Sequence, residues 1–223
     1  MVWLKSFLKQ KSWWYFPGAL SVAKEKHLVE NYKMLFSDLG VQFSIFPEIT
    51  WSGVHALYAG YKEDFEDVKR KNFEILENKH VQRVVSNDPH ESFVLHHEYG
   101  LEVTPAVSLL ERHHHKLVGR GSGKAQYIPC NILHNKFNVE KALRRVLERS
   151  GYVVVKKPVK PIPCDPVFFQ NFPRLTKVVV ERVLEGVAEP VLITGCPHCY
   201  HLLKTFAGEG FTIVELSEVF VEV

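Results

Sequence analysis

The sequence predicts an α/β protein built from two pseudo-repeated lobes, each a mostly parallel sheet flanked by helices. Two observations predict this class: helical and strand periodicities alternate along the chain, and segments of the first half recur in order in the second half. Such alternation is typical of parallel sheets covered by helices. Of the 223 residues, 46% are hydrophobic and 24% are charged, which is the balance of a protein able to bury a substantial core.

The internal repeat shows as three anchors, displaced by a nearly constant distance of roughly 110 residues. Because the displacement hardly changes from one anchor to the next, we interpret the two halves as products of a duplication. The matched pairs are residues 15–18 with 127–130, residues 39–41 with 150–152, and residues 84–91 with 192–199.

The elements of the first half follow from its periodicity. The aromatic segment around Tyr15 predicts the first strand, and residues 1–11, if helical, would pack on the core or against a partner subunit. Gly40 ends a helix, and residues 41–45 then alternate as a half-buried strand. A further helix is expected near 62–79, followed by a strand over 81–86. The apolar face of the first long helix consists of Leu28, Tyr32, Leu35, Phe36 and Leu39.

The second half repeats this order. Asn138 is expected to cap a helix with Leu143, Val146 and Leu147 on one face, and Gly151 to end it before the strand 152–155. A helix near 173–186 and strands over 191–194 and 211–216 complete the prediction. The first domain is expected to span residues 1–107 and the second residues 108–223.

The joint between the lobes is expected near 105–124. Gly119, Gly121 and Gly123 indicate a loop there. The segment is not a phosphate-binding loop, because Val118 stands where such a loop needs glycine and Ala125 where it needs Ser or Thr.

Charge and hydropathy exclude several function classes. The net charge of +3 is too small and too evenly spread for a dedicated nucleic-acid surface. No stretch approaches the roughly 18 consecutive apolar residues of a membrane span. Lysines at positions 5, 9 and 11 occupy the place of a signal peptide's apolar segment, so we expect a cytoplasmic location.

All four cysteines lie in the second half, and they are the main functional signal. Cys130, Cys164 and Cys196 each follow or lie between predicted strands, and Cys199 completes a Cys-Pro-His-Cys sequence at a predicted helix start. Because loops after parallel strands open at one edge of the sheet, three loops can bring four thiols together. We therefore predict a metal site formed by Cys130, Cys164, Cys196 and Cys199.

Four thiolates suit either a tetrahedral Zn²⁺ or an iron–sulfur cluster, and their spacing does not separate the two. Four unrelated buried cysteines are the simplest alternative. A thiol–disulfide oxidoreductase fits less well, because only 24 residues follow Cys199. No catalytic residue is assigned; His198 is expected to face solvent or cap a backbone group. The apolar cover of the site is expected to come from Phe168, Phe169 and Phe172.

These residues resemble the CCG cysteine-rich domain family, typified by the cysteine-rich subunit of heterodisulfide reductase. Members carry two domains, each with Pro-(Gly)-Cys, Cys-Cys-Gly and Cys-Pro-x-Cys motifs. The second half is similar through Pro129-Cys130, Cys164 and residues 196–199. In the first half the cysteines of the family are replaced by Ala19, Trp51, Ser52, Asp88 and Glu91.

The resemblance implies a first domain that kept its fold and lost its metal ligands. In the family, five cysteines per domain are associated with a noncubane [4Fe–4S] cluster. Four cysteines beside Asp165 leave a cubane [4Fe–4S] cluster, a modified noncubane cluster with an oxygen ligand, or zinc. The implied function is an iron–sulfur redox subunit, an oxidoreductase component that works with other subunits of a heterodisulfide reductase-like complex. The alternative is a non-catalytic scaffold subunit with a structural zinc.

Overall fold

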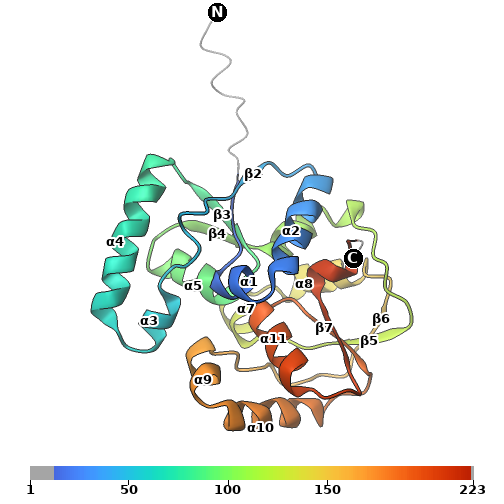
Figure 1. Cartoon of the computed structure of the whole chain (residues 1–223). Coiled ribbons are helices and arrows are strands. Elements are labelled where there is room, and N and C mark those ends of the chain that lie inside the picture. Colours follow the sequence, from blue (N-terminus) through green and yellow to red (C-terminus); the bar gives the residue numbers. More distant parts are fainter. Residues whose placement is uncertain (1–12, 222–223) are drawn as a thin grey trace, which may run out of the picture.

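The computed structural model describes residues 13–221 and places two parallel sheets in two lobes (Figure 1). The strands are β1 (Trp13–Phe16), β2 (Phe43–Ser44), β3 (Arg83–Ser86), β4 (Glu102–Pro105), β5 (Lys124–Tyr127), β6 (Val153–Val155), β7 (Val191–Thr194) and β8 (Thr212–Glu215). The helices are α1 (Ala19–Ala23), α2 (Lys26–Asp38), α3 (Val54–Tyr58), α4 (Lys62–Asn78), α5 (Pro89–His97), α6 (Ala106–Arg112), η2 (His114–Lys116), α7 (Asn131–Phe137), α8 (Glu140–Leu147), α9 (Pro166–Asn171), α10 (Pro173–Leu184), α11 (Pro197–Phe206) and η3 (Leu216–Val219).

The two sheets have the same topology. The first lobe has the order β2-β1-β3-β4 and the second the order β6-β5-β7-β8, and all pairs are parallel. The carboxyl ends of β1 and β3 therefore lie side by side, as do those of β5 and β7. This identity of order confirms the α/β prediction and the repeat found in the sequence.

The lobes pack against each other with approximate two-fold symmetry. The repeat makes α1 equivalent to α7 and α5 equivalent to α11. Helix α1 contacts α11 across the lobes, and the equivalent contact, between α7 and α5, is also present. In the same way the contact between α2 and η3 is equivalent to the contact between α8 and α6, whereas α3 packs against its own equivalent, α9. The segments that follow β1 and β3 thus face those that follow β5 and β7.

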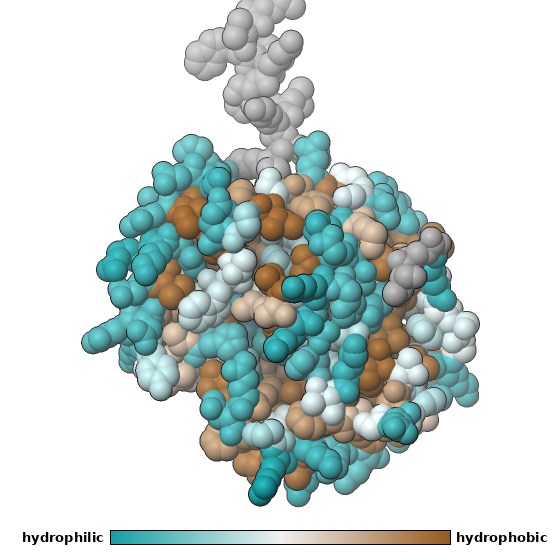
Figure 2. Space-filling view, in the orientation of Figure 1, coloured by the Kyte–Doolittle hydropathy of each residue, from teal (hydrophilic) through white to brown (hydrophobic). Residues whose placement is uncertain are grey.

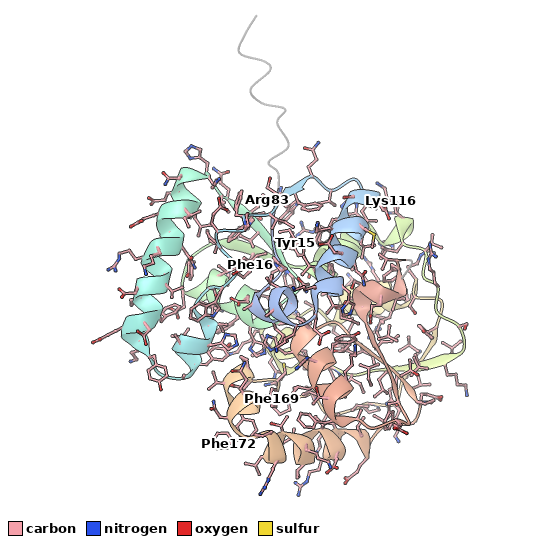
Figure 3. All side chains as sticks on the ribbon, viewed as in Figure 1. Tyr15, Phe16, Arg83, Lys116, Phe169 and Phe172 are labelled. Atoms are coloured by element: carbon pink, nitrogen blue, oxygen red, sulfur yellow. The ribbon has the colours of Figure 1, made fainter. Side chains whose placement is uncertain are left out.

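Strand β1 shows how the pleat divides the core. Trp13 and Tyr15 point into a core shared by both lobes, whereas Trp14 and Phe16 point to a second core under the helices of the first lobe. Tyr15 and Phe16 are labelled on opposite sides of the strand in Figure 3. Because side chains alternate across a strand, four consecutive buried aromatic residues indicate a strand covered on both faces.

Several predicted elements are confirmed. Helices α2, α4 and α10 and strands β3, β7 and β8 lie within two residues of the predicted bounds. Strand β2 is shorter than the predicted 41–45. The helix considered for residues 1–11 lies outside the described residues.

One prediction about the fold is wrong. Asn138 does not begin a helix: it adopts a left-handed conformation (φ 48°) directly after α7, which ends at Phe137, and Val139 precedes α8. The short polar side chain of asparagine tolerates this conformation. The joint predicted near 105–124 is where the chain passes from β4 of the first sheet to β5 of the second, and Gly119, Gly121 and Gly123 lie in a loop there. Helix α6, which buries Leu109 and Leu110, occupies the start of this joint.

Exposed apolar side chains gather on and beside α10. Hydrophilic side chains cover most of the face in Figure 2, and apolar side chains show in several places, among them its lower edge, where Figure 1 shows α9 and α10. Phe172, Leu175 and Val178 are exposed on and beside α10. In the described part of the chain, no helix is long and apolar enough to cross a membrane.

Candidate metal centre

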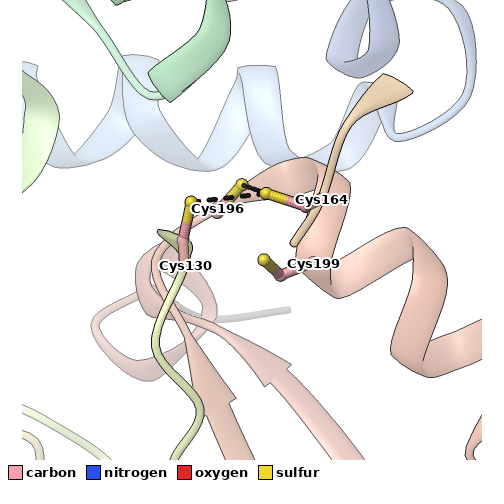
Figure 4. A group of neighbouring side chains, drawn as sticks. All are labelled: Cys130, Cys164, Cys196 and Cys199. Atoms are coloured by element: carbon pink, nitrogen blue, oxygen red, sulfur yellow. Dashed lines mark hydrogen bonds between the residues drawn. The ribbon is translucent and has the colours of Figure 1, made fainter. Parts of the chain in front are cut away.

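The four cysteines come together in the second lobe as predicted (Figure 4). Their sulfur atoms all lie within 4.8 Å of one another, and all four residues are buried. Sγ of Cys164 lies 3.4 Å from Sγ of Cys130 and 3.9 Å from Sγ of Cys196. Buried cysteines scattered through a core would not converge in this way, so the geometry is that of a site able to hold a metal.

The sheet edge positions Cys130 and Cys164. Cys130 follows β5 and precedes the first turn of α7. The loop that carries Cys164 is held beside it by backbone hydrogen bonds, from the Ile162 amide to the Pro129 carbonyl at 2.9 Å and from the Asn131 amide to the Ile162 carbonyl at 3.2 Å. These bonds extend the sheet by one bridge and set the distance between the two thiols.

Helix α11 positions the other two thiols. Cys196 directly precedes the helix, Pro197 is its first residue, and Cys199 lies in the first turn. Proline suits this position because the first amide of a helix has no intrahelical partner. Both sulfurs therefore lie near the helix N-terminus, where the dipole stabilises thiolates.

The four thiols differ in how readily they ionise. Burial alone would raise the pKa of Cys130, but hydrogen bonds from the other three thiols lower it well below the ordinary value. The hydrogen bond with Cys130 raises the pKa of Cys164, and burial raises those of Cys196 and Cys199. Metal binding must therefore displace protons from most of the thiols.

The sulfur spacing can be compared with the two metal types. A tetrahedral ion with metal–sulfur bonds of about 2.3 Å needs sulfur–sulfur separations of about 3.8 Å, close to the two distances above. A [4Fe–4S] cluster places several irons and sulfides between the thiolates and therefore needs a wider site. Because the thiols here hydrogen-bond to one another, a cluster would have to separate them.

The corresponding position in the first lobe contains a polar network in place of thiols. Asp88 stands where Cys196 stands, directly before α5, and Glu91 stands where Cys199 stands. Glu91 accepts hydrogen bonds from the amide of Ser52 at 3.1 Å, from the hydroxyl of Ser52, and from the amide of Ala19 at 3.4 Å. Hydrogen bonds thus tie together the three segments that four thiols tie together in the second lobe.

Gly18, and not Ala19, occupies the position that corresponds to Cys130. It directly precedes α1, as Cys130 precedes α7. Gly18 has a φ of 80°, and a Cβ atom there would lie 2.5 Å from Oδ2 of Asp88. The carboxylate of Asp88 fills the space that a side chain at position 18 would need.

The network leaves Glu91 hard to ionise. Burial, followed by repulsion from Asp88, raises the pKa of Glu91 to about 8. Burial would also raise the pKa of Asp88, but the charge of His198 and its hydrogen bond to the carboxylate have the larger effect and lower this pKa. The two carboxyl groups therefore differ in charge near neutral pH.

Two histidines cross between the lobes at this place. Nε2 of His198 lies 3.0 Å from Oδ2 of Asp88, and Nε2 of His90 lies 3.3 Å from Sγ of Cys164. The two rings pack edge to face with centroids 4.8 Å apart. The expectation that His198 faces solvent is wrong: the residue is 5% exposed, because its partner lies in the opposite lobe.

The sequence could not indicate either contact. His90 and His198 occupy equivalent positions in the repeated segments 84–91 and 192–199, and this is the one available signal. Burial, followed by repulsion from His198, lowers the pKa of His90 to about 4. Burial also acts to lower the pKa of His198, but the attraction of the Asp88 carboxylate is stronger and raises it.

Asp165 does not lie among the candidate metal ligands. Its Oδ1 caps α9 by accepting hydrogen bonds from the amides of Val167 and Phe168, each at 2.9 Å. The predicted apolar cover is present only in part. Phe169 is buried, whereas Phe172 is 52% exposed and lies at the outer edge of the lobe (Figure 3).

Two cavities open along the contact between the lobes. One of about 350 Å³ reaches Cys164 and is lined also by Tyr58, His90, Asn131 and Asp165. The other, of about 370 Å³, lies beside His198 and is lined by Ala19, His55 and Phe169 among others. The first provides an approach from solvent towards the thiols.

Comparison with known families agrees with this arrangement. The model of the CCG cysteine-rich domain matches residues 13–94 and again residues 125–204. The chain belongs to the CCG cysteine-rich domain family. Each match covers the first three strands of one sheet and the segments at their carboxyl ends, and stops before β4 or β8. This CCG protein therefore contains the family domain twice and has thiols only in the second copy.

No curated protein matches the sequence of this CCG protein. Among solved structures, glutamate racemase RacE1 from Bacillus anthracis is similar with a TM-score of 0.41 and 17% identity, over 94% of this chain and 79% of that one. PH1733, an aspartate racemase homologue from Pyrococcus horikoshii OT3, has a TM-score of 0.41 and 12% identity, over 94% and 95% of the two chains.

Proposed function

We propose that this CCG protein is an iron–sulfur redox subunit, similar to the cysteine-rich subunit of heterodisulfide reductase, that transfers electrons in a disulfide- or thiol-linked oxidoreductase complex. The observation that carries the proposal is the convergence of four buried thiols at one sheet edge of a CCG domain. Such a donor set suits an iron–sulfur cluster. We propose Cys130, Cys164, Cys196 and Cys199 as its ligands.

The donor set supports a [4Fe–4S] cluster by its chemistry. All four candidate ligands are cysteines, and the oxygen of Asp165 is engaged at the start of α9. This favours a cubane cluster over a modified noncubane cluster with an oxygen ligand. The cluster would supply one-electron chemistry when bound, and the chain contributes the thiolates and the buried surroundings that set its reduction potential.

The substrate and partners are proposed from family resemblance. Heterodisulfide reductase acts with several subunits, so we propose that this chain works in a comparable complex, in the cytoplasm. The exposed apolar segment formed by Phe172, Leu175 and Val178 is compatible with assembly into a larger complex.

A second candidate function is favoured by the sulfur spacing. Separations of 3.4 and 3.9 Å suit a single tetrahedral Zn²⁺, which would make the chain a non-catalytic scaffold subunit. The loss of all thiols from the first lobe is compatible with this function as well.

Metal analysis of anaerobically purified protein separates the two functions. A redox subunit is expected to show a visible absorption band and about four iron and four sulfide per chain. Cys164→Ser should remove most of both, whereas His97→Phe, an exposed position on α5, should remove neither. A colourless protein with one zinc per chain would overturn the redox proposal and support the scaffold.

A further inference from the structure

We propose that His90, from the lobe without thiols, is a positioning residue of the metal centre: it donates an N–H···S hydrogen bond to Cys164 and is held in that orientation by Tyr58. This inference rests on the proposed metal centre. It concerns the chain's own residues and applies to either metal.

The contact crosses from one lobe to the other. His90 lies in the first turn of α5, and its Nε2 is 3.3 Å from Sγ of Cys164 in the second lobe. Both residues are 1% exposed. A hydrogen bond between side chains this deeply buried is electrostatically stronger than one in water.

The direction of the hydrogen bond follows from the chemistry of the sulfur. A thiolate bound to a metal has no proton to donate, so the hydrogen between the two atoms must belong to Nε2 of His90. In the neutral ring Nδ1 is then an acceptor. The hydroxyl of Tyr58 lies 3.4 Å from Nδ1 and can donate to it. Tyr58, His90 and Cys164 thus form a chain of hydrogen bonds that selects one tautomer.

The surroundings restrict the imidazole to this orientation. The His198 ring packs edge to face against it, and the Tyr58 ring does so from another side, with centroids 5.7 Å apart. His198 is itself held by Asp88. The polar network of the first lobe therefore helps to hold His90, the residue that donates a hydrogen bond to Cys164 of the second lobe.

The consequence is a defined effect on the metal. A hydrogen bond to a ligating sulfur withdraws electron density from the metal, and at a redox-active site such as an iron–sulfur cluster it stabilises the more reduced state. Loss of the bond should weaken that state, so that an iron–sulfur site in a His90→Phe variant would be harder to reduce than in the wild type.

The test uses full-length, ¹⁵N-labelled protein loaded with ¹¹³Cd²⁺, which reports thiolate ligation whatever the native metal. The cadmium resonance of the wild type should show four thiolates. Long-range ¹H–¹⁵N spectra should place the His90 proton on Nε2, with a scalar coupling from that proton to ¹¹³Cd. His90→Phe should shift the cadmium resonance and abolish the coupling.

Two further variants keep the test decisive if His90→Phe folds poorly. His90→Gln retains an amide donor at the place of Nε2 and should restore most of the wild-type cadmium shift. Tyr58→Phe should leave the four-thiolate signature intact but mix the two tautomers. His97→Phe is the matched control on the exposed side of α5 and should change neither reading.

The outcomes distinguish this inference from the proposed function. A four-thiolate cadmium signal that is identical in the wild type and His90→Phe, with the proton on Nδ1, would overturn the role of His90 alone. A cadmium signal without four thiolates would overturn the metal centre itself and, with it, the inference.

Discussion

His198 of the second lobe pairs with Asp88 of the first, with Nε2 and Oδ2 3.0 Å apart and both side chains almost fully buried. Asp88 stands where the second lobe has the metal-site residue Cys196. The ion pair therefore joins the lobes at the position where the first lobe has a carboxylate and the second a thiol. Removing one partner of a buried ion pair strands the other charge without compensation.

Replacement of Asp88 should destabilise the protein strongly. Asp88→Ala removes the partner of His198 and also the cap of α5, where Oδ1 accepts from the amides of His90 and Glu91. We expect a loss of about 3–5 kcal/mol in the free energy of unfolding, measured in urea at pH 6. Asp88→Asn should cost less, because asparagine caps a helix as well as aspartate does.

Asp165 provides the matched control for that experiment. It caps α9 with the same geometry, and no ion pair of Asp165 is found among the described residues. Asp165→Asn should therefore change the unfolding free energy by a few tenths of a kcal/mol at most. Equal losses in Asp88→Asn and Asp165→Asn would show that the cross-lobe pair contributes nothing.

Glu91 should make stability depend on pH in an unusual direction. Its pKa in the folded protein is about 8, above the ordinary 4.5, so the folded state holds a proton that the unfolded state has released. Stability must then fall as pH rises from about 4.5 through about 8. Glu91→Gln should remove this part of the slope. Melting temperatures at pH 5 and pH 8 test it, and parallel curves for the two proteins would contradict it.

Much of the fold could be predicted because its signals are local. The apolar face of α2 and the apolar runs of β3 and β7 each lie within one element, and Gly40 marks the end of its helix. Helix α6 escapes prediction because it is short and buries Leu109 and Leu110 against the other lobe. Asn138 is ambiguous in the sequence because asparagine suits both ends of a helix.

The four cysteines of the site could be predicted from the sequence, but the contacts of His90 and His198 around them could not. The convergence of Cys130, Cys164, Cys196 and Cys199 could be predicted because the alternation of strands and helices indicates a parallel sheet, in which the loops after the strands open at one edge. The roles of His90 and His198 depend on how two lobes face each other, and nothing in one lobe's periodicity encodes that arrangement. Asp165 suggests an oxygen ligand in the sequence because it adjoins Cys164, whereas its carboxylate faces the start of α9.

Tyr32 should stabilise the contact between the lobes through one buried hydrogen bond. Its hydroxyl donates to Oε1 of Glu215 at 2.9 Å, and burial raises the pKa of Glu215 to about 7. Tyr32→Phe removes a donor to the charged form, so this pKa should rise further and stability should fall by about 1–3 kcal/mol, more at pH 8 than at pH 6. Chemical unfolding at both pH values measures the loss.

Tyr200→Phe is the comparison for Tyr32→Phe. Its hydroxyl donates at 3.0 Å to Glu218, whose side chain is more exposed than that of Glu215, and also contacts His27 and Lys204. Water can replace hydrogen bonds at this partly exposed place, so the loss should be smaller. A larger loss in Tyr200→Phe than in Tyr32→Phe would contradict the role given to the buried bond.

Removal of the metal should loosen the second lobe and leave the first unchanged. In the second lobe the segment 156–165 contains no helix or regular strand. It is held to the sheet by a hydrogen bond from Gln126 to the Lys157 carbonyl, by backbone bonds around Ile162, and by Cys164. In the first lobe, Glu91 already binds the segment at Ser52 without any metal. Hydrogen exchange should therefore quicken at Ile162 and Cys164 after chelation, while the Ser52 amide keeps its rate.

The first lobe thus serves as an internal control for the second. The two segments hold equivalent places in their lobes, beside equivalent helices, and differ in what ties them down: carboxylate hydrogen bonds in one and thiols in the other. Protection of an amide falls when local opening becomes easier. If chelation speeds exchange at Ser52 as much as at Ile162, the metal stabilises the contact between the lobes as a whole, and the first lobe's network does not replace it.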